Sequence, residues 1–342
     1  MIQVDSLTKD YAGRLAISDV SFSVEKGEIL GFLGPNGAGK TTTMRILTGY
    51  LPPTSGTATI AGFDVSEESL EARRHIGYLP ESVPLYRELT VRDYLDFSAR
   101  LRGISREERR KKIAVAVEKL NLGDVVDRSI GKLSKGYRQR VGIAQAVLHE
   151  PDVVILDEPT EGLDPRQRTE TRALLRELGK EHTVILSTHI LPEVEATCDR
   201  VLIISDGRIV ASDTPHGLSA RLTRGQRLDV LVVAEEDHVR VALDDVLGIQ
   251  NLSTEALPEG LRRVVIEGKP DIELRNLVAR TLVNAGIELY ELKSEQVSLE
   301  DVFLRLTRGD VDPSDVVQRE RAPRAQSVPE EQTSAEILEE RL

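Results

Sequence analysis

An apolar run, a glycine-rich loop and a helical pattern follow one another early in the chain, and this succession restricts the fold more than any other feature. Ile29–Leu33 predicts a buried strand, and Thr42–Leu47 has the pattern of a helix. The residues between them, Gly34–Thr41, match G-x-x-x-x-G-K-[ST]. Between a strand and a helix, this motif predicts a loop that binds nucleotide phosphates at one edge of an α/β sheet.

The residue types in this loop suit phosphate chemistry. Glycines let the backbone wrap the phosphates with its N–H groups pointing inward, and the helix N-terminus adds a favourable field. We expect Lys40 to neutralise charge on the β- and γ-phosphates and the Thr41 hydroxyl to ligate Mg²⁺. A flexible turn before an ordinary helix is the alternative. The predicted nucleotide contacts are Gly34, Pro35, Asn36, Gly37, Ala38, Gly39, Lys40, Thr41 and Thr42.

Two acidic residues end a second buried strand, which is predicted by the apolar run Val153–Leu156. In an open parallel sheet, ligands gather at the carboxyl ends of the strands. Asp157 is therefore a candidate Mg²⁺ ligand, and Glu158 is a candidate to orient or deprotonate an attacking water. The alternative is an acidic pair that caps the following turn.

A second candidate phosphate-binding surface lies at Leu133–Tyr137, just before this strand. Ser134 offers a hydroxyl and Gly136 permits close approach of a backbone. The helix that begins near Lys135 presents free N–H groups. One nucleotide cannot easily touch both surfaces of a single subunit, so this segment suggests a clamp for a nucleotide held on another subunit.

With these motifs in this order, residues 1–214 resemble the ATP-binding subunit of an ABC transporter. The matching elements are the phosphate loop, the signature Leu133–Tyr137, the strand Val153–Glu158, the loop Glu161–Asp164 and a switch histidine, His189. The resemblance implies an α/β fold of the P-loop NTPase, ABC type, with a RecA-like core, an antiparallel β subdomain and a helical signature subdomain. It also implies two subunits that close head to tail on ATP.

The resemblance assigns roles that residue type alone leaves open. Tyr11 matches the aromatic that stacks on adenine, and Asp164 joins the nucleotide-binding candidates. His189 matches the histidine that contacts the γ-phosphate, so the catalytic candidates become Glu158, His189 and Lys40. Without the resemblance, Tyr11 reads as an exposed strand aromatic and His189 as a structural histidine.

The sequence departs from the family pattern in two places. The signature reads Ser-Lys-Gly-Tyr where Ser-Gly-Gly-Gln is commonest, and Lys135 should add positive charge near the partner's phosphates. Glu81 stands where the family usually has a glutamine. Glu81 remains a candidate ligand of Mg²⁺ and of the nucleotide, with an added negative charge that bears on rate and coupling.

Charge, cysteine content and the length of apolar runs limit the kinds of binding partner and the cellular compartment that we expect for this protein. The chain has 57 acidic against 45 basic residues, so non-specific affinity for nucleic acid is not expected. A single cysteine, Cys198, excludes disulfides within the chain and fits a reducing compartment. No run approaches the ~18 apolar residues of a transmembrane helix, and Met1–Asp5 lacks a signal sequence. Together with this absence, the resemblance to an ABC transporter subunit implies peripheral binding at the cytoplasmic face of the inner membrane, beside a permease on a separate chain that Glu81–Glu88 would meet.

The pattern along the chain predicts three regions: an ABC domain at 1–220, an accessory domain at 226–308 and a disordered tail at 310–342. The first region opens with short strands in Ile2–Gly27. The second reads β-α-β-β-α-β, typical of a ferredoxin-like fold, with a helix over His238–Leu247. A closing helix is expected at Leu299–Leu306. A capped terminal turn at Thr333–Glu336 is a further candidate.

The motifs favour a transport ATPase that works as a dimer. With its appended C-terminal domain the chain resembles the drug-export type of ABC ATPase, and this resemblance favours export over import. The alternative is a soluble ABC ATPase in translation or DNA metabolism. Such proteins are marked by tandem nucleotide domains, a long heptad insertion or cysteine-rich zinc loops, and the sequence has none of these. A regulatory subunit that binds ATP without hydrolysis is a third possibility. The cargo cannot be read from this chain.

Overall fold

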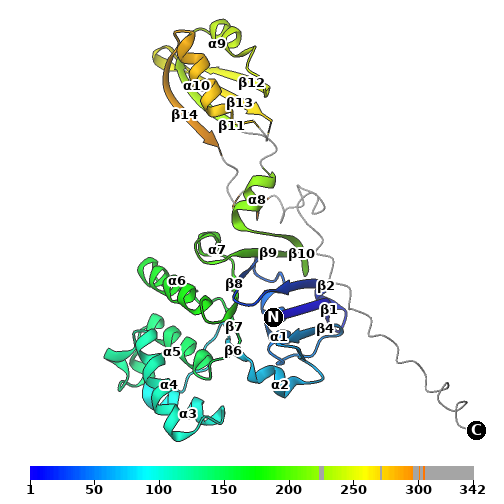
Figure 1. Ribbon diagram of the computed structural model, residues 1–342, viewed down its shortest axis with the longest axis vertical. Helices are drawn as coiled ribbons and strands as arrows, with labels where there is room; N and C mark the ends of the chain where they lie inside the picture. Colours follow the sequence, from blue (N-terminus) through cyan, green and yellow to red (C-terminus); the bar gives the residue numbers. More distant parts are fainter. Residues whose placement is uncertain (223–226, 270–271, 296–299, 301–302, 305–342) are drawn as a thin grey trace, which may run out of the picture.

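The computed structural model describes residues 1–222, 227–269, 272–295, 300 and 303–304. Three sheets organise them (Figure 1). The predicted helix at Leu299–Leu306 falls largely outside the described residues, and the predicted tail at 310–342, with its candidate turn at Thr333–Glu336, falls wholly outside them. Within the described parts of the chain, no helix combines the length and the apolar character that crossing a bilayer requires.

The first sheet is antiparallel, with the strand order β2-β1-β4-β5. In place of the expected short strands, β1 and β2 are 10 and 11 residues long. Register shifts interrupt their pairing, and such bulges let two long strands twist together without splitting. The four strands are β1 (Ile2–Tyr11), β2 (Arg14–Val24), β4 (Ser55–Ile60) and β5 (Phe63–Asp64).

The central sheet has six strands in the order β10-β9-β3-β8-β7-β6. All neighbours are parallel except β9 and β10, which form a hairpin at Asp206–Gly207. Because β3 adjoins β8 and β8 adjoins β7, the carboxyl ends of these three strands meet at one edge. The bounds are β3 (Ile29–Leu33), β6 (Ile76–Leu79), β7 (Val153–Asp157), β8 (Thr183–Thr188), β9 (Arg200–Ser205) and β10 (Arg208–Asp213).

Two apolar cores cover the two faces of the central sheet. In β7, Val154 and Leu156 belong to one core, whereas Val153 and Ile155 belong to the other, because successive side chains point to opposite faces. This double burial explains the uninterrupted apolar runs of β3 and β7. One core is shared with the helices α3 (Val91–Leu101), α4 (Arg106–Lys119) and α5 (Lys135–Val147). The other core is shared with the antiparallel sheet and with the helices α1 (Lys40–Leu47) and α2 (Ser69–Arg74).

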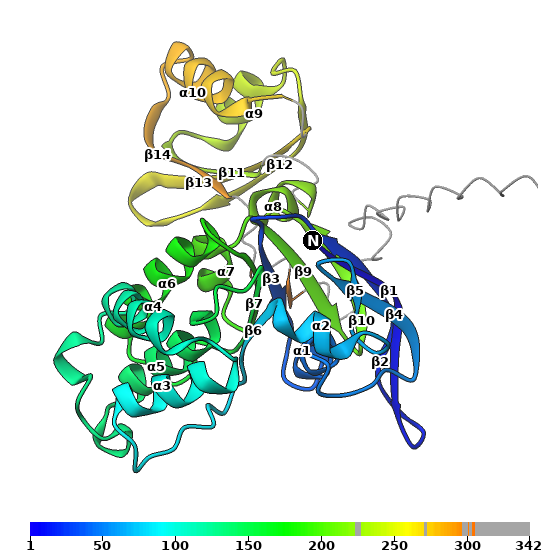
Figure 2. The same cartoon turned by 60° about the horizontal axis from the view of Figure 1, so that its bottom comes forward.

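The helices α3, α4 and α5 form a group of their own, which both views place together, away from the antiparallel sheet (Figures 1 and 2). The helices of this part of the chain are α1 (Lys40–Leu47), α2 (Ser69–Arg74), α3 (Val91–Leu101), α4 (Arg106–Lys119), α5 (Lys135–Val147), α6 (Pro165–Gly179), α7 (Leu191–Thr197) and α8 (Pro215–Leu222). Single 3₁₀ turns lie at Gly123–Val125 and Ile130–Lys132.

The third sheet is fully antiparallel, with the order β12-β13-β11-β14, and it packs with α9 and α10 around a separate core. Helix α9 ends at Leu243, short of the predicted Leu247. Asp244 and Asp245 follow it directly, and negative charge is unfavourable at a helix C-terminus. The elements are β11 (Arg227–Val233), α9 (Glu236–Leu243), β12 (Ile249–Ala256), a 3₁₀ turn (Pro258–Gly260), β13 (Leu261–Gly268), α10 (Leu274–Asn284) and β14 (Glu288–Glu295).

Candidate active site

The phosphate loop connects β3 to α1, as the motif predicts. Gly39 is the N-cap of α1 and has a φ of 109°, which few residues other than glycine adopt. A Cβ atom at Gly39 would lie 2.6 Å from Ile17 Cγ2 and 2.8 Å from the Ala16 carbonyl oxygen. The loop therefore requires glycine here for both its backbone conformation and its packing. Because no side chain caps α1, its first N–H groups stay available to an anion.

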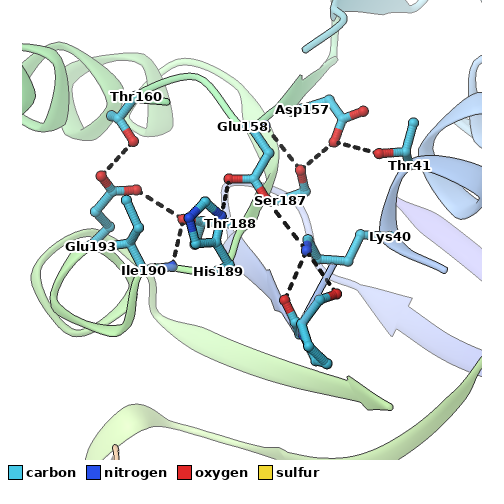
Figure 3. A network of polar contacts seen from close by, with 12 residues as sticks. Lys40, Thr41, Asp157, Glu158, Thr160, Ser187, Thr188, His189, Ile190 and Glu193 are labelled. Carbon is cyan, nitrogen blue, oxygen red and sulfur yellow. Dashed lines mark hydrogen bonds and ion pairs between the residues drawn. The ribbon is translucent and has the colours of Figure 1, made fainter. Parts of the chain in front are cut away.

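Lys40 is buried, and it lies inside the curve of the loop. Its ammonium donates to the carbonyl oxygens of Gly34, at 2.8 Å, and Pro35, at 3.3 Å. The same ammonium lies 3.3 Å from Glu158 Oε1 (Figure 3). The loop thus holds a cation at its centre, where a phosphate would approach the N-terminus of α1.

A cavity of about 320 Å³ opens beside this cation. Its lining comes from the phosphate loop and the start of α1, from Ala16 of β2, and from the segments that follow β6, β7 and β8. The lining residues are Ala16, Asn36, Gly37, Gly39, Lys40, Thr41, Thr42, Glu81, Glu158, Glu161 and His189. Among the other predicted loop contacts, Gly34 and Pro35 turn their carbonyl groups to Lys40, and Ala38 is 3% exposed.

Asp157 is fully buried at the end of β7. Its Oδ1 accepts hydrogen bonds from the hydroxyls of Ser187, at 2.5 Å, and Thr41, at 3.4 Å. Its Oδ2 is buried and has no hydrogen-bond partner among the residues that the structure describes. A buried carboxylate oxygen without a donor is costly, and a hard cation prefers oxygen ligands of this kind. The pair of Asp157 and Thr41 therefore fits Mg²⁺.

Glu158 turns its carboxylate into the cavity. Its φ of 48° lies in the left-handed region, where residues other than glycine are uncommon. Two hydrogen bonds hold the backbone there, from the Glu158 N–H to the Ser187 carbonyl at 3.1 Å and to the Ser187 hydroxyl at 3.0 Å. Strained residues of this kind cluster at functional sites.

The second carboxylate oxygen of Glu158 contacts the histidine predicted as a switch. Glu158 Oε2 lies 2.9 Å from Nδ1 of His189, whose side chain is 40% exposed at the cavity (Figure 3). A carboxylate held between a lysine and a histidine is fixed in orientation. In this position it is suited to bind a water molecule and accept its proton.

Two further acidic groups line the cavity. Burial and the charges of Glu161, Asp157 and Glu158 raise the pKa of Glu81 above its ordinary value. Glu161 was not among the predicted site residues. Its signal in the sequence was its place in the loop Glu161–Asp164, directly after the acidic strand end. The added carboxylates make this side of the cavity attractive to a divalent cation.

The predicted second phosphate surface lies at a separate cavity of about 340 Å³. Ser134 caps α5 and accepts a hydrogen bond from the Tyr137 N–H at 3.3 Å. Asp164 likewise caps α6 and accepts from the Gln167 N–H at 2.8 Å. The lining residues are Ser134, Gly136, Tyr137, Arg140, Asp164, Arg166, Gln167 and Glu170. Asp164 thus lies with the signature and apart from the phosphate loop of its own subunit.

Tyr11 is the predicted site residue that lies apart from both cavities. It ends β1, is 45% exposed, and its ring centroid lies 5.5 Å from the Lys9 ammonium. A cation over an exposed aromatic face is a stable arrangement by itself.

A phosphate loop between β3 and α1 and an acidic end of β7, joined in one parallel sheet, define a P-loop nucleotide-binding protein. The start of α5 at Ser134–Gly136, which lines a separate cavity, indicates a particular family of these nucleotide-binding proteins. A family model described as ABC transporter matches residues 17–161.

Similarity to known proteins extends beyond that segment. The chain is 32% identical to the linearmycin resistance ATP-binding protein LnrL of Bacillus subtilis (strain 168), over 90% of this chain and 98% of that protein. It is 36% identical to the Nod factor export ATP-binding protein I of Burkholderia orbicola (strain AU 1054), over 90% of this chain and 96% of that protein. The chain therefore belongs to the ABC transporter ATP-binding protein family.

A solved structure of the same class supports both the fold and the chemistry. The dimeric, post-hydrolysis ATP-binding cassette MJ0796 bound to ADP and Pi superposes with a TM-score of 0.58. It is 26% identical in sequence, and the match covers 63% of this chain and 98% of that one. The predictions of an ABC-type α/β fold and of an ATPase are confirmed. The alternative of a translation or DNA-metabolism ATPase is not favoured.

Proposed function

We propose that this protein binds MgATP on its phosphate loop and hydrolyses it after closing head to tail with a second copy. One observation carries the proposal: the phosphate-loop cavity and the signature cavity share no lining residue. Each subunit thus offers two half-sites for ATP, and a second subunit is needed to combine them. The structurally similar cassette MJ0796 is a dimer in its structure with ADP and Pi.

Within each composite site, we assign roles from the geometry. The loop N–H groups and Lys40 bind the phosphates, and Thr41, Asp157 and Glu81 hold Mg²⁺, which would neutralise charge on the phosphates when bound. Glu158 orients a water and accepts its proton, and His189 holds Glu158 and contacts the γ-phosphate. Across the dimer, the partner's signature, with its Ser134 hydroxyl and Gly136 backbone, closes on the same phosphates.

We also assign nucleotide contacts to Tyr11 and Asp164, which lie outside the phosphate-loop cavity. Tyr11 is exposed and therefore accessible to an adenine ring, which would have to compete with the Lys9 ammonium for its face. Asp164 lines the signature cavity and would approach the nucleotide of the second subunit.

For the membrane partner, we propose a polytopic permease on a separate chain, bound at the cytoplasmic face of the inner membrane. A cavity of about 360 Å³ lies between the segment after β6 and the start of α5, with Val83, Leu85, Arg87 and Lys135 in its lining. Close by in sequence, Tyr86 is 53% exposed and Phe97 is 37% exposed, and their rings pack edge to face. Exposed aromatic groups of this kind mark protein-binding surfaces.

Export is the direction that the relatives favour, because one is named for linearmycin resistance and another for Nod factor export. We divide the chain for this function into an ATPase domain at 1–220, an accessory domain at 226–308 and a tail at 310–342. The four-stranded antiparallel sheet and the separate apolar core of the second region support its treatment as a unit.

The composite site is tested by mixing two inactive variants. Lys40→Ala removes the phosphate loop's cation, and Ser134→Asp places a negative charge at the signature while keeping a residue that caps α5. Each variant alone should lack ATPase activity. An equal mixture should regain about a quarter of the wild-type rate, since half of the dimers are mixed and each holds one intact site. A mixture that stays inactive although the two variants form mixed dimers in the presence of ATP would contradict the head-to-tail proposal.

A further inference from the structure

One buried carboxylate connects the two loops that line the two cavities. Glu193 lies in the first turn of α7 and is 2% exposed. Its Oε1 accepts a hydrogen bond from the Thr160 hydroxyl, and its Oε2 accepts one from the Thr188 hydroxyl at 3.0 Å (Figure 3). Both threonines are buried as well. Glu193 therefore uses each of its oxygens to hold a different segment of the chain.

The first of these segments leads from β7 to the signature cavity. Thr160 follows Glu158 by two residues, and its carbonyl accepts a hydrogen bond from the Leu163 N–H at 3.2 Å. Glu161 lines the phosphate-loop cavity, and Asp164 lines the signature cavity. This segment, Thr160–Asp164, thus faces the surface where a second subunit would close.

The second segment is the turn that carries the switch histidine. Thr188 ends β8, and its hydroxyl also accepts a hydrogen bond from the Ile190 N–H at 3.0 Å. This bond closes the turn around His189, which in turn contacts Glu158. The position of the His189 ring therefore depends on Thr188, and Thr188 is held by Glu193.

We propose that Glu193 is a positioning residue that couples the segment Thr160–Asp164 to the turn of His189. Closure of a second subunit on Asp164 is then transmitted through Thr160 and Glu193 to His189, which sets the orientation of Glu158. This inference rests on the proposed function, because it concerns the same composite ATP site.

The chemistry of Glu193 supports coupling over simple packing. The neighbouring Val194 fills the core beside it with an apolar side chain, whereas an acidic side chain in such a place needs hydrogen-bond donors to offset the loss of water. Hydrogen bonds to a carboxylate are stronger than those between neutral groups. A buried carboxylate with two hydroxyl donors fixes both partners at once, which one apolar residue does not do.

Hydrogen exchange of the nucleotide-free protein tests the coupling directly, whether or not ATP is hydrolysed. Thr160→Val removes one hydroxyl at nearly constant volume. It should speed exchange of the Ile190 N–H by about fivefold, although Thr160 itself does not bond to that turn. The matched control is Thr169→Val, an exposed threonine of α6, which should leave this amide unchanged. Acceleration confined to Thr160–Asp164 would overturn the proposal.

Steady-state kinetics test the consequence for catalysis. Glu193→Gln should lower kcat about tenfold and change the KM for ATP less than about twofold, since Lys40 and the N–H groups of the phosphate loop still bind the phosphates. Glu195→Gln removes the same charge from an exposed position of α7 and should behave as the wild type. A wild-type kcat for Glu193→Gln overturns the coupling, as does a loss that only follows the folded fraction.

A Glu193→Gln variant that does not fold and a wild-type protein without ATPase activity have different consequences for the proposal. If Glu193→Gln does not fold, Thr160→Val and Thr188→Val carry the kinetic test, and wild-type kcat values for both would overturn the proposal. If the wild-type protein itself lacks ATPase activity, the proposed function is wrong, and the exchange experiment still decides whether Glu193 couples the two segments.

Discussion

The ammonium of Lys40 lies 3.3 Å from Glu158 Oε1, so the cation that awaits the phosphates neutralises the carboxylate that would activate water. Both side chains are less than a tenth exposed, which leaves few other ways to satisfy either charge. An entering phosphate competes with Glu158 for Lys40. The nucleotide-free protein thus keeps its candidate base paired until a phosphate takes its place.

Lys40→Ala should abolish measurable ATP affinity and lower hydrolysis at least about a hundredfold, because the central cation of the loop is lost. The variant should also melt at a lower temperature, since it leaves Glu158 buried without its lysine. Binding of a fluorescent ATP analogue and calorimetric melting measure the two effects. The exposed Lys26→Ala serves as the control, and ATP binding by Lys40→Ala at wild-type affinity would contradict the assignment.

Glu158→Gln should bind ATP but hydrolyse it at least about a hundredfold more slowly, because the amide does not accept a proton from water. The ATP-bound form should accumulate as a dimer, visible by size-exclusion chromatography with light scattering. Glu177→Gln, at an exposed position of α6, should hydrolyse ATP normally and remain in the nucleotide-free oligomeric state between turnovers. Normal turnover by Glu158→Gln would remove this residue from its role.

Glu81→Gln should raise the Mg²⁺ concentration needed for half-maximal ATPase activity by roughly three- to tenfold. The raised pKa of Glu81 reflects burial and a cluster of neighbouring carboxylates, and this negative field attracts a divalent cation. Magnesium titrations at saturating ATP measure the shift. The control is Glu88→Gln, which changes an exposed glutamate outside the cavity. Superimposable titration curves for Glu81→Gln and wild type would show that Glu81 does not bind the cation.

The sequence specified the parts of the site that depend on local motifs. The phosphate loop, the acidic strand end and the signature helix each carry their own residue pattern, so the sequence alone predicts Lys40, Asp157 and Ser134 as site residues. The parallel sheet explains why Lys40 and Asp157 lie near each other, since the ends of β3, β7 and β8 meet at one edge.

Contacts that depend on tertiary packing were not visible in the sequence. Glu193 lies in a helix of ordinary pattern, and only the fold brings it to Thr160, which is 33 residues earlier in the chain. Glu161 was quoted as part of a loop, but its place in the cavity depends on how the chain turns after Pro159. Strands were predicted in Ile2–Gly27, but the length of β1 and β2 was underestimated because bulges break the alternation that identifies a strand.

His149 gives the ATPase domain a pH dependence of its own. Burial, followed by the charge of Arg102, lowers the pKa of His149 from 6.5 to about 4. Its Nε2 lies 3.1 Å from the Ile76 carbonyl oxygen, and its Nδ1 is buried with no hydrogen-bond partner in the described part of the chain. The folded protein therefore favours the neutral ring, whereas the unfolded chain takes up a proton at its ordinary pKa.

The sign of the effect follows from proton uptake. Between pH 6.5 and about 4 the unfolded state binds more protons at His149, so stability is fully present above pH 6.5 and falls as the pH decreases through this window. Because the ring is partly exposed to solvent, we discount the effect of the pKa shift, and the loss in the free energy of unfolding is about 2 kcal/mol.

His149→Gln keeps a donor for the Ile76 carbonyl but does not titrate. Its melting temperature, measured by calorimetry, should therefore fall less steeply with decreasing pH than that of the wild type. The exposed His238→Gln should keep the wild-type slope, and an unchanged slope for His149→Gln would show that this histidine does not set the acid sensitivity.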